Sequence, residues 1–307
     1  MTTLTGATRS SITAAVRAAI EPGLVTTFAQ STPLLNLLNI QQLESGDSIN
    51  WKVKYAANSA GGDHNEGDPL PTAGKASYAD ATRSFQLLGV PVKVSGHAMD
   101  AARGSYFDPI EQEMQDGIKQ LALLTEAKVL VWLLAAIDDD STYAGLTRST
   151  VHMDSVVVDA DSGTLAIAQL KSLVQQLKAR PREVVLNPAD HMWLSAPTLS
   201  DEYKDNLVAG YDAAHPIVRN ASDQVLDAST LQKTGYYAGV PWYEVNSLAE
   251  TYVILLNKNH VKLRWIRNVT VEPLGKTSDD TEWWMTYHIG MAISDPYRNG
   301  KIENIVL

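Results

Sequence analysis

The chain has 307 residues, of which 45% are hydrophobic and 20% are charged, a composition typical of a globular protein and not of a disordered one. Lys and Arg number 25 against 35 Asp and Glu, and the net charge of -10 disfavours a protein that coats nucleic acid, because phosphate neutralisation needs a basic face. The sequence has no cysteine, which excludes disulfides, thiolate zinc sites and thiol catalysis.

No segment has the length and character of a membrane span. The purest apolar run, VLVWLLAAI at 129–137, is far shorter than the roughly 20 residues that a span needs. The N-terminus, MTTLTGATRSS, lacks the charged-then-apolar pattern of a secretion signal, so we expect the chain to be made and used in a cytoplasm.

The first elements are short helical pieces followed by an extended excursion. Pro33 can start a helical turn in which Leu34, Leu37 and Leu38 share one face. Residues 49–55 alternate apolar and polar side chains, which predicts a half-buried strand, and a matching strand is predicted to return near 85–96. Between them, residues 56–81 contain only Leu70 and Tyr78 as large apolar residues. Since an isolated two-stranded hairpin is marginally stable, either this loop is disordered or it lies on another surface, such as a partner subunit.

The clearest predicted element is a helix at 108–137. Asp108 is a suitable N-cap, Pro109 fits the first helical position, and Glu111 completes a capping box. At about 1.5 Å per residue the helix would be about 45 Å long, which suits a spine joining separate substructures. The predicted core-facing stripe consists of Ile110, Met114, Ile118, Leu121, Thr125, Val129, Trp132 and Ala136.

The remaining sequence alternates helix and strand and then becomes purely β. An amphipathic helix is predicted within 163–181, followed by a short strand that ends at the Asn187-Pro188 turn and by a helix start. Short strands are predicted at 239–245 and 251–256. The last segment is expected to contain three strands, at 261–266, 269–274 and 281–294.

The sequence shows no catalytic or cofactor-binding motif. It contains no glycine-rich phosphate loop, nucleophile elbow or HExxH helix, and the calcium-loop-like DADSG at 159–163 has Leu170 where a bidentate Glu is required. His64, Glu66 and Asp68 form a cluster for which a loop tip or an intersubunit patch is a better interpretation than a metal site, since nothing fixes a geometry. We therefore predict no catalytic, cofactor-binding or metal-binding residue.

The order of these parts resembles that of the major capsid proteins of tailed double-stranded-DNA bacteriophages, which have the Hong Kong 97-like fold. The resemblance covers nearly the whole chain, and it is the joint order of the local segments that is specific. The segments that carry it are STPLLNLLNIQQLESGDSINWKV (31–53), NEGDPLP (65–71), GVPVKVSGHAMDAA (89–102), VVLNPADHMWL (184–194) and YYAGVPWYEV (236–245).

The resemblance implies an α+β capsid fold with five named parts. These are an N-terminal arm (1–46), an extended β-hairpin loop (47–94), a spine helix (108–137) within a peripheral domain (95–140 and 259–307), and an axial α/β domain (141–258). It implies a structural, non-enzymatic protein of the virion, assembled in the host cytoplasm. Its subunits would form hexamers and pentamers of an icosahedral shell that encloses double-stranded DNA without sequence-specific binding, with scaffolding, portal and decoration proteins as further candidate partners.

The excursion carries the residues that we predict at the subunit interface: Glu66, Asp68, Leu70, Lys75 and Arg83. Both signs of charge occur there, and exposed pairs contribute only about 0–1 kcal/mol each, so they would set register while apolar burial drives association.

Three other classes of protein remain open from the sequence. The first is an encapsulin-type nanocompartment, which shares the fold but encloses a cargo enzyme, and the second is a phage tail or adaptor protein. The third is a soluble α/β enzyme, for which Asp190 and His191 beside Trp193 would be the candidate catalytic residues.

Overall fold

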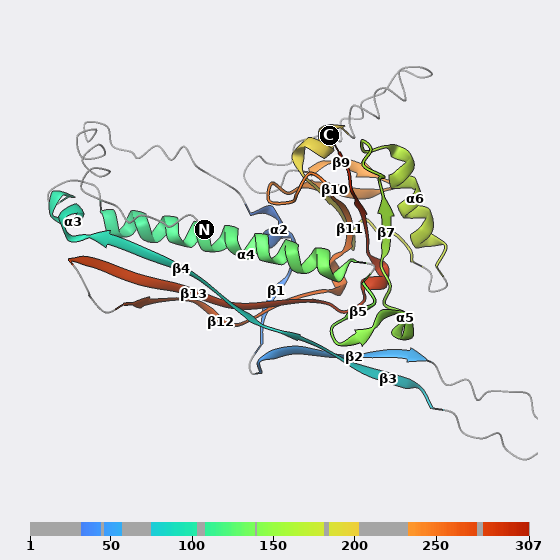
Figure 1. The fold of residues 1–307 in the computed structure, drawn as a ribbon, viewed down its shortest axis with the longest axis horizontal. Helices are drawn as coiled ribbons and strands as arrows, with labels where there is room; N and C mark the ends of the chain where they lie inside the picture. Colours follow the sequence, from blue (N-terminus) through green and yellow to red (C-terminus); the bar gives the residue numbers. More distant parts are fainter. Residues whose placement is uncertain are drawn as a thin grey trace, which may run out of the picture.

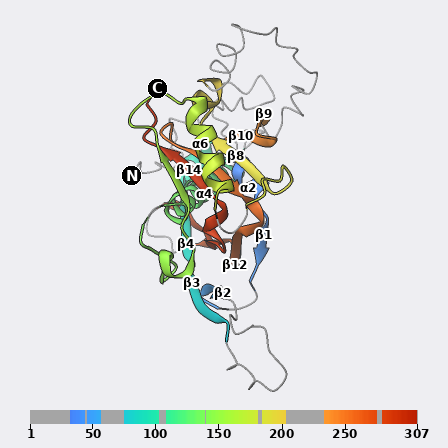
Figure 2. The same cartoon turned by 90° about the vertical axis from the view of Figure 1, so that its right-hand side faces the viewer.

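One long helix lies along a twisted four-stranded sheet, and a second sheet stands at one end of this layer (Figure 1). The computed structural model describes residues 32–43, 46–56, 75–102, 108–138, 140–180, 184–202, 233–274 and 279–306. A two-stranded hairpin leaves the molecule near the junction of the two parts and projects away from both sheets (Figure 2). The mixture of helices and strands confirms the predicted α+β class.

The long helix α4 runs from Pro109 to Ala136, which confirms the predicted spine. Asp108 caps it: the carboxylate accepts hydrogen bonds from Ile110 N at 2.9 Å and Glu111 N at 3.4 Å, satisfying amides that a helix start leaves without a partner. Glu111 does not complete the expected box, because its carboxylate instead accepts from Gln115 Nε2 at 3.2 Å. With 28 residues, α4 spans about 42 Å at about 1.5 Å per residue.

The sheet beneath α4 has the order β1-β12-β13-β4. Its strands are β1 (Ile40–Gln42), β12 (Val261–Pro273), β13 (Asp280–Ile293) and β4 (Gln86–Ser95). Val92 and Met285 are buried on the side that α4 covers. The strands predicted at 261–266 and 269–274 are one strand, because β12 continues past irregularities between Trp265 and Thr270 without leaving β13.

The predicted core-facing stripe of α4 is only partly correct. Ile118 is 51% exposed in the subunit, so its predicted position in the core is wrong. Gly117 faces the sheet instead, and a Cβ added there would lie 2.6 Å from Val92 Cγ2. Because each residue turns a helix by about 100°, Ile118 points away from the strands when Gly117 is against them. The predicted positions that are buried are Leu121, Thr125, Val129 and Ala136.

The hairpin consists of β2 (Ser48–Ala56) and β3 (Ser77–Ser84). The strand predicted at 49–55 is confirmed, but its partner is β3 and not the strand predicted near 85–96. That second strand is formed as β4, and it pairs with β13 in the sheet under α4. Strand β3 begins at Ser77, inside the stretch 56–81 that the sequence analysis interpreted as a connection, so the hairpin closes before β4 enters the main sheet.

The second sheet has the order β7-β14-β11-β8-β10-β9, and helix α6 (Ile167–Lys178) packs on β7 and β14. Trp193 and Trp242 stack in its core with ring centroids 5.4 Å apart. The strands are β7 (Val156–Asp159), β14 (Gly300–Glu303), β11 (Val253–Asn257), β8 (His191–Ser195), β10 (Val240–Glu244) and β9 (Lys233–Tyr237).

One predicted strand of this part is misplaced. Residues 184–187 form no strand, and the turn after Asn187 leads into β8. All five residues of β8 are buried between β10 and β11, so its side chains lack the alternation that marks a half-exposed strand. The helix start predicted after this turn is displaced, because β8 follows the turn and the helical residues are 197–202.

The remaining elements are short. They are α2 (Pro33–Leu37), α3 (Gly96–Ala102), β5 (Thr142–Tyr143), β6 (Leu146–Thr147), α5 (Arg148–Val151), η1 (Lys258–His260) and η2 (Pro296–Arg298). Among the described residues, no helix is both long and apolar enough to cross a membrane.

Candidate functional site

The hairpin β2–β3 is the most prominent projecting feature of the described fold (Figures 1 and 2). Near its root, Ile49 and Trp51 are buried against the molecule, whereas Tyr78, toward the far end, is 60% exposed. Lys52 and Asp80 pair across the strands at 3.9 Å with both side chains exposed, a contact that contributes at most about 1 kcal/mol. The outer hairpin is thus a two-stranded ribbon with little stability of its own.

The residues predicted at the subunit interface fall into two groups. Glu66, Asp68 and Leu70 lie outside the described residues. Lys75 is exposed shortly before β3 begins, and Arg83 lies near the other end of that strand, at the hairpin root. There the guanidinium carbon of Arg83 is 4.9 Å from the ring centroid of Tyr143, so Arg83 has a partner within its own chain.

A buried acid that the sequence analysis missed joins three parts of the chain. Glu126 of α4 is 0% exposed. Its Oε2 accepts a hydrogen bond from Leu34 N of α2 at 3.2 Å, and its Oε1 accepts from Ser247 Oγ at 2.9 Å. Burial raises the pKa of Glu126, and the hydrogen bonds oppose the rise. Glu126 follows Thr125 of the predicted stripe. This position near the apolar face of the helix was the only feature of the sequence that could have indicated a buried acid.

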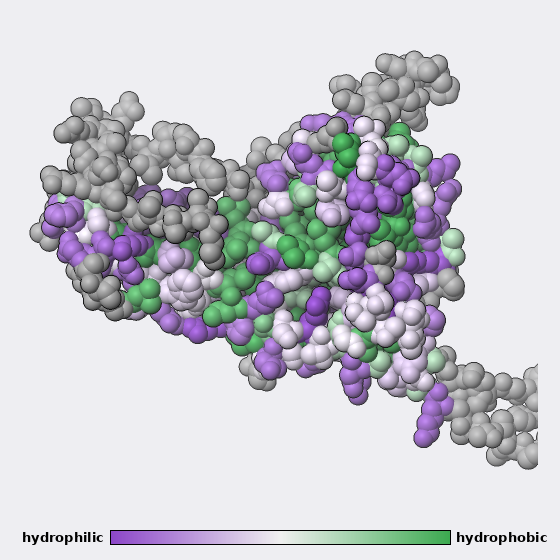
Figure 3. Space-filling model, viewed as in Figure 1, coloured by the Kyte–Doolittle hydropathy of each residue, from purple (hydrophilic) through white to green (hydrophobic). Residues whose placement is uncertain are grey.

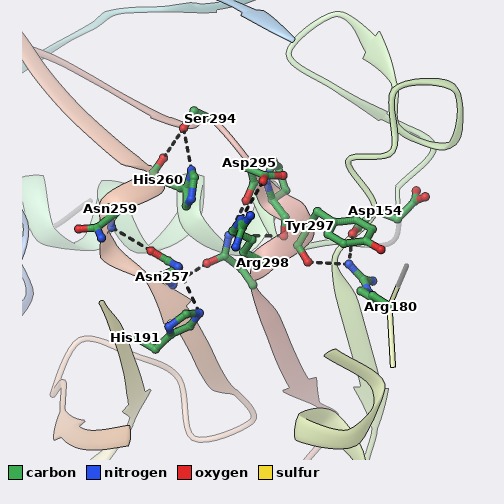
Figure 4. Close-up of polar contacts among 12 residues, drawn as sticks. Asp154, Arg180, His191, Asn257, Asn259, His260, Ser294, Asp295, Tyr297 and Arg298 are labelled. Carbon is green, nitrogen blue, oxygen red and sulfur yellow. Dashed lines mark hydrogen bonds and ion pairs between the residues drawn. The ribbon is translucent and has the colours of Figure 1, made fainter. Parts of the chain in front are cut away.

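A network of polar contacts lies where the two sheets meet (Figure 4). At the end of β11, Asn257 N donates to Asn299 Oδ1 at 2.7 Å, and the Asn257 amide lies 3.2 Å from His191 Nε2. At the end of β13, Ser294 N donates to His260 O at 2.8 Å. These bonds satisfy polar groups at the junction, where strands of both sheets end.

The residues considered for an enzyme take part in this packing. Burial lowers the pKa of His191, whose Nδ1 accepts a hydrogen bond from Asn187 N at 3.3 Å. Asp190 accepts from the side-chain amides of Asn187 at 2.9 Å and Asn259 at 2.7 Å. Trp193 lies in the core of the second sheet. Each side chain therefore has a structural partner.

Nothing in the described part of the chain groups three or more His, Cys, Asp or Glu residues as metal ligands. The DADSG segment forms a turn in which Asp159 Oδ1 accepts hydrogen bonds from Asp161 N at 2.8 Å and Asn304 Nδ2 at 3.1 Å. His64, Glu66 and Asp68 lie outside the described residues.

Solved structures with this architecture come from protein shells. The fold resembles a chain of the capsid of cyanophage A-1(L), with a TM-score of 0.67 and 15% identity over 93% of this chain and 96% of that one. It also resembles the SrpI encapsulin of Synechococcus elongatus PCC 7942, with a TM-score of 0.60 and 13% identity over 95% of each chain. A capsid of a native GTA particle matches at a TM-score of 0.63 and 12% identity, over 93% of this chain and 95% of that one. These likenesses define the class: the fold is Hong Kong 97-like.

The family follows from the sequence itself. The model of the SU10 major capsid protein family matches residues 3–306, and the chain belongs to this family. No curated protein matches it. It is thus a major capsid protein of tailed phages, a structural protein of the virion that forms the icosahedral shell. Proteins of this class assemble into multi-subunit shells of hexamers and pentamers.

Proposed function

We propose that this chain forms the shell around a packaged double-stranded DNA genome and has no catalytic role, and that it assembles in the host cytoplasm. The observation that carries the assembly proposal is the hairpin β2–β3, which leaves the subunit with its outer half uncovered by another described layer. A neighbouring subunit supplies the missing surface. The net charge of -10 suits a container wall that must not adhere to the DNA inside it.

We further propose that the hairpin crosses the first half of a neighbour's α4. The exposed cations Lys52, Lys54 and Lys75 lie on or beside the hairpin. Acidic residues outnumber basic ones at the start of α4, where Asp108, Glu111, Glu113 and Asp116 stand against Lys119. Ile118 adds exposed apolar surface among these charges. Figure 3 shows apolar side chains exposed along the course of α4 on the face in view. The same contact would place Glu66, Asp68, Leu70, Lys75 and Arg83 at or near the interface.

The division into an N-terminal arm (1–46), extended loop (47–94), peripheral domain (95–140 and 259–307) and axial domain (141–258) remains our proposal. The layer of α4 on its sheet and the second sheet with α6 support two packed units. Two strand pairings cross the proposed boundaries. Strand β4, assigned mostly to the extended loop, pairs with β13 of the peripheral domain. Strand β14, assigned to the peripheral domain, pairs with β11 of the axial domain.

The assembly proposal is tested on the full chain by size-exclusion chromatography with light scattering and by negative-stain microscopy. We expect species of hexamer size or larger, and less assembly at high salt because the proposed contact is between exposed charges. A strictly monomeric protein at high concentration under every salt condition would overturn the proposal.

The content of the particles tests the proposal that the shell encloses DNA, because the SrpI encapsulin has the same fold. Particles isolated from infected cells should contain DNA together with portal protein, and any scaffolding or decoration proteins should purify with them. A co-purifying cargo enzyme in place of DNA would favour the compartment.

A further inference from the structure

The root of the hairpin rests on one buried aromatic ring, Tyr143. Its side chain is 4% exposed, and its hydroxyl accepts a hydrogen bond from Ile293 N, at the end of β13, at 2.8 Å. Burial raises the pKa of Tyr143, so the phenol stays neutral. The ring is therefore fixed to the end of the longest strand of the main sheet.

Two guanidinium groups lie against this ring. Arg148, 1% exposed, has its guanidinium carbon 5.1 Å from the ring centroid, and it donates to Ala136 O at 2.9 Å and Ala135 O at 3.0 Å. Those carbonyls are at the C-terminal end of α4, so Arg148 attaches the ring to the spine helix as well. Arg83 approaches from β3, with its guanidinium carbon 4.9 Å from the ring centroid. A cation over an aromatic face is attracted by the ring quadrupole.

The other strand of the hairpin contacts the same ring. The ring of Trp51, on β2, lies 6.4 Å from that of Tyr143 at 50°. Among the described residues, Trp51 Nε1 has no hydrogen-bond partner although it is buried, so ring contacts hold this side chain. The backbone adds one bond, from Thr82 N to Ala144 O at 3.2 Å. Both strands therefore meet Tyr143 where they leave the molecule.

We propose that Arg83 and Tyr143 are positioning residues that set the direction in which the hairpin leaves the subunit. A two-stranded ribbon is easily bent, so its direction must be fixed at its base. The nine residues of β2 extend about 30 Å at about 3.3 Å per residue, so a tilt of about 10° at the root moves the far end by about 5 Å. A shift of that size would misalign the hairpin on a neighbouring subunit, so the proposal rests on the docking proposed above.

The test compares Arg83→Gln and Arg83→Lys with the parent in the full chain. Arg267→Gln is the matched control, because Arg267 is an exposed cation that pairs with Glu272 within β12. We call the contacts of Arg83 and Trp51 with Tyr143 the clamp. Hydrogen exchange of the free subunit measures directly how firmly the clamp holds the hairpin root. We expect the Thr82 amide to exchange at least about tenfold faster in Arg83→Gln than in the parent, with global melting unchanged, and at an intermediate rate in Arg83→Lys. The control should match the parent.

Microscopy of the assembled variants gives the second measurement. We expect Arg83→Gln to form fewer shells and a wider range of diameters than the parent, while Arg267→Gln forms normal ones. Unchanged Thr82 exchange in Arg83→Gln would overturn the proposed clamp, whether or not the parent assembles. Faster exchange together with normal shells would show that the root does not control assembly, which overturns the positioning role. Failure of the parent itself to assemble would refute the proposed docking on a neighbouring subunit. The exchange rate of the Thr82 amide would then still show whether Arg83 holds the hairpin root.

Discussion

At the scale of single residues, Glu126 is the most unusual group in the described fold. A buried carboxylate is costly, and here the electrostatic influences on it are hydrogen bonds from neutral donors, with no basic side chain among the described groups acting on it. The acid holds α2, at the end of the proposed N-terminal arm, against the spine helix. Pattern analysis finds apolar faces, and it gives no reason to place a Glu inside one.

We expect Glu126→Ala to lower the free energy of unfolding by on the order of 3 kcal/mol. The buried Leu34 amide and Ser247 hydroxyl would lose their acceptor, and each unsatisfied donor costs about 1–3 kcal/mol. Glu126→Gln keeps an oxygen that can accept a hydrogen bond from Leu34 N or Ser247 Oγ, and its side chain carries no charge. Because the folded-state pKa of Glu126 is raised, its contribution to stability is largest in acid and falls as the pH rises through that pKa.

The melting temperature of Glu126→Gln minus that of the parent should therefore increase as the pH rises from below the ordinary pKa of a glutamate through the raised folded-state pKa of Glu126. Thermal unfolding of both proteins in parallel measures this difference and cancels the titration of all other groups. A difference that does not change with pH would contradict the raised pKa.

At the scale of elements, the sequence predicted the spine helix well but its buried face poorly. The cap at Asp108 and the end near residue 137 are local signals, and they were recognised. The buried side changes along α4, because the sheet covers Gly117 and Leu121 whereas α2 and the Ser247 loop cover Glu126. A single stripe assumes one partner on one side. A helix with two partners on different sides has no single stripe, so Ile118 was wrongly assigned to the core.

A pair of neighbouring substitutions tests which face is buried. Leu121 is 2% exposed, and Leu121→Asp should unfold the subunit or make it insoluble, because it buries a charge at a cost of several kcal/mol. Ile118→Asp, at an exposed position of the same helix, should change stability by no more than about 0.5 kcal/mol. Solubility, circular dichroism and melting of the free subunits distinguish them. Equal damage by both would contradict the assigned face.

Strand β3 was missed for a related reason. Its sequence, SYADATRS, has little apolar alternation, because β3 is exposed at alternate positions and depends on β2 for pairing. The buried strands β4 and β13 carry strong patterns and were found. Of the candidate site, the sequence could indicate the excursion as a whole from its lack of core residues. It could not reveal that Arg83 lies on Tyr143, since that contact joins residues 60 positions apart in the chain.

At the scale of the whole molecule, the subunit has more projecting surface than its own core requires. The hairpin contacts the rest of the chain at its root, through Trp51, Thr82 and Arg83. The sequence between its strands adds little apolar material: residues 59–76 contain four glycines, two prolines and Leu70 as the only large apolar side chain. Folding of the subunit and assembly of the shell should therefore depend on different parts of the chain.

Replacing residues 59–76 by a short Gly-Ser turn should separate these two properties. We expect the free subunit to melt near the parent's temperature, because shortening a loop changes its closure entropy by well under about 1 kcal/mol per twofold change in length. Shells should fail to form or should be much less stable, since Glu66, Asp68 and Leu70 are removed with the segment. Thermal melting and electron microscopy of the variant and the parent measure the two effects.

The two measurements can disagree with the expectation in different ways, and each has a distinct meaning. Normal shells from the shortened chain would show that residues 59–76 are a dispensable surface feature, and the interface would then have to lie on the strands β2 and β3 themselves. A collapse of subunit melting would show that the segment belongs to the core. Only near-native melting combined with lost assembly identifies the segment as part of the contact between subunits, because that combination removes an interface and leaves the folded subunit intact.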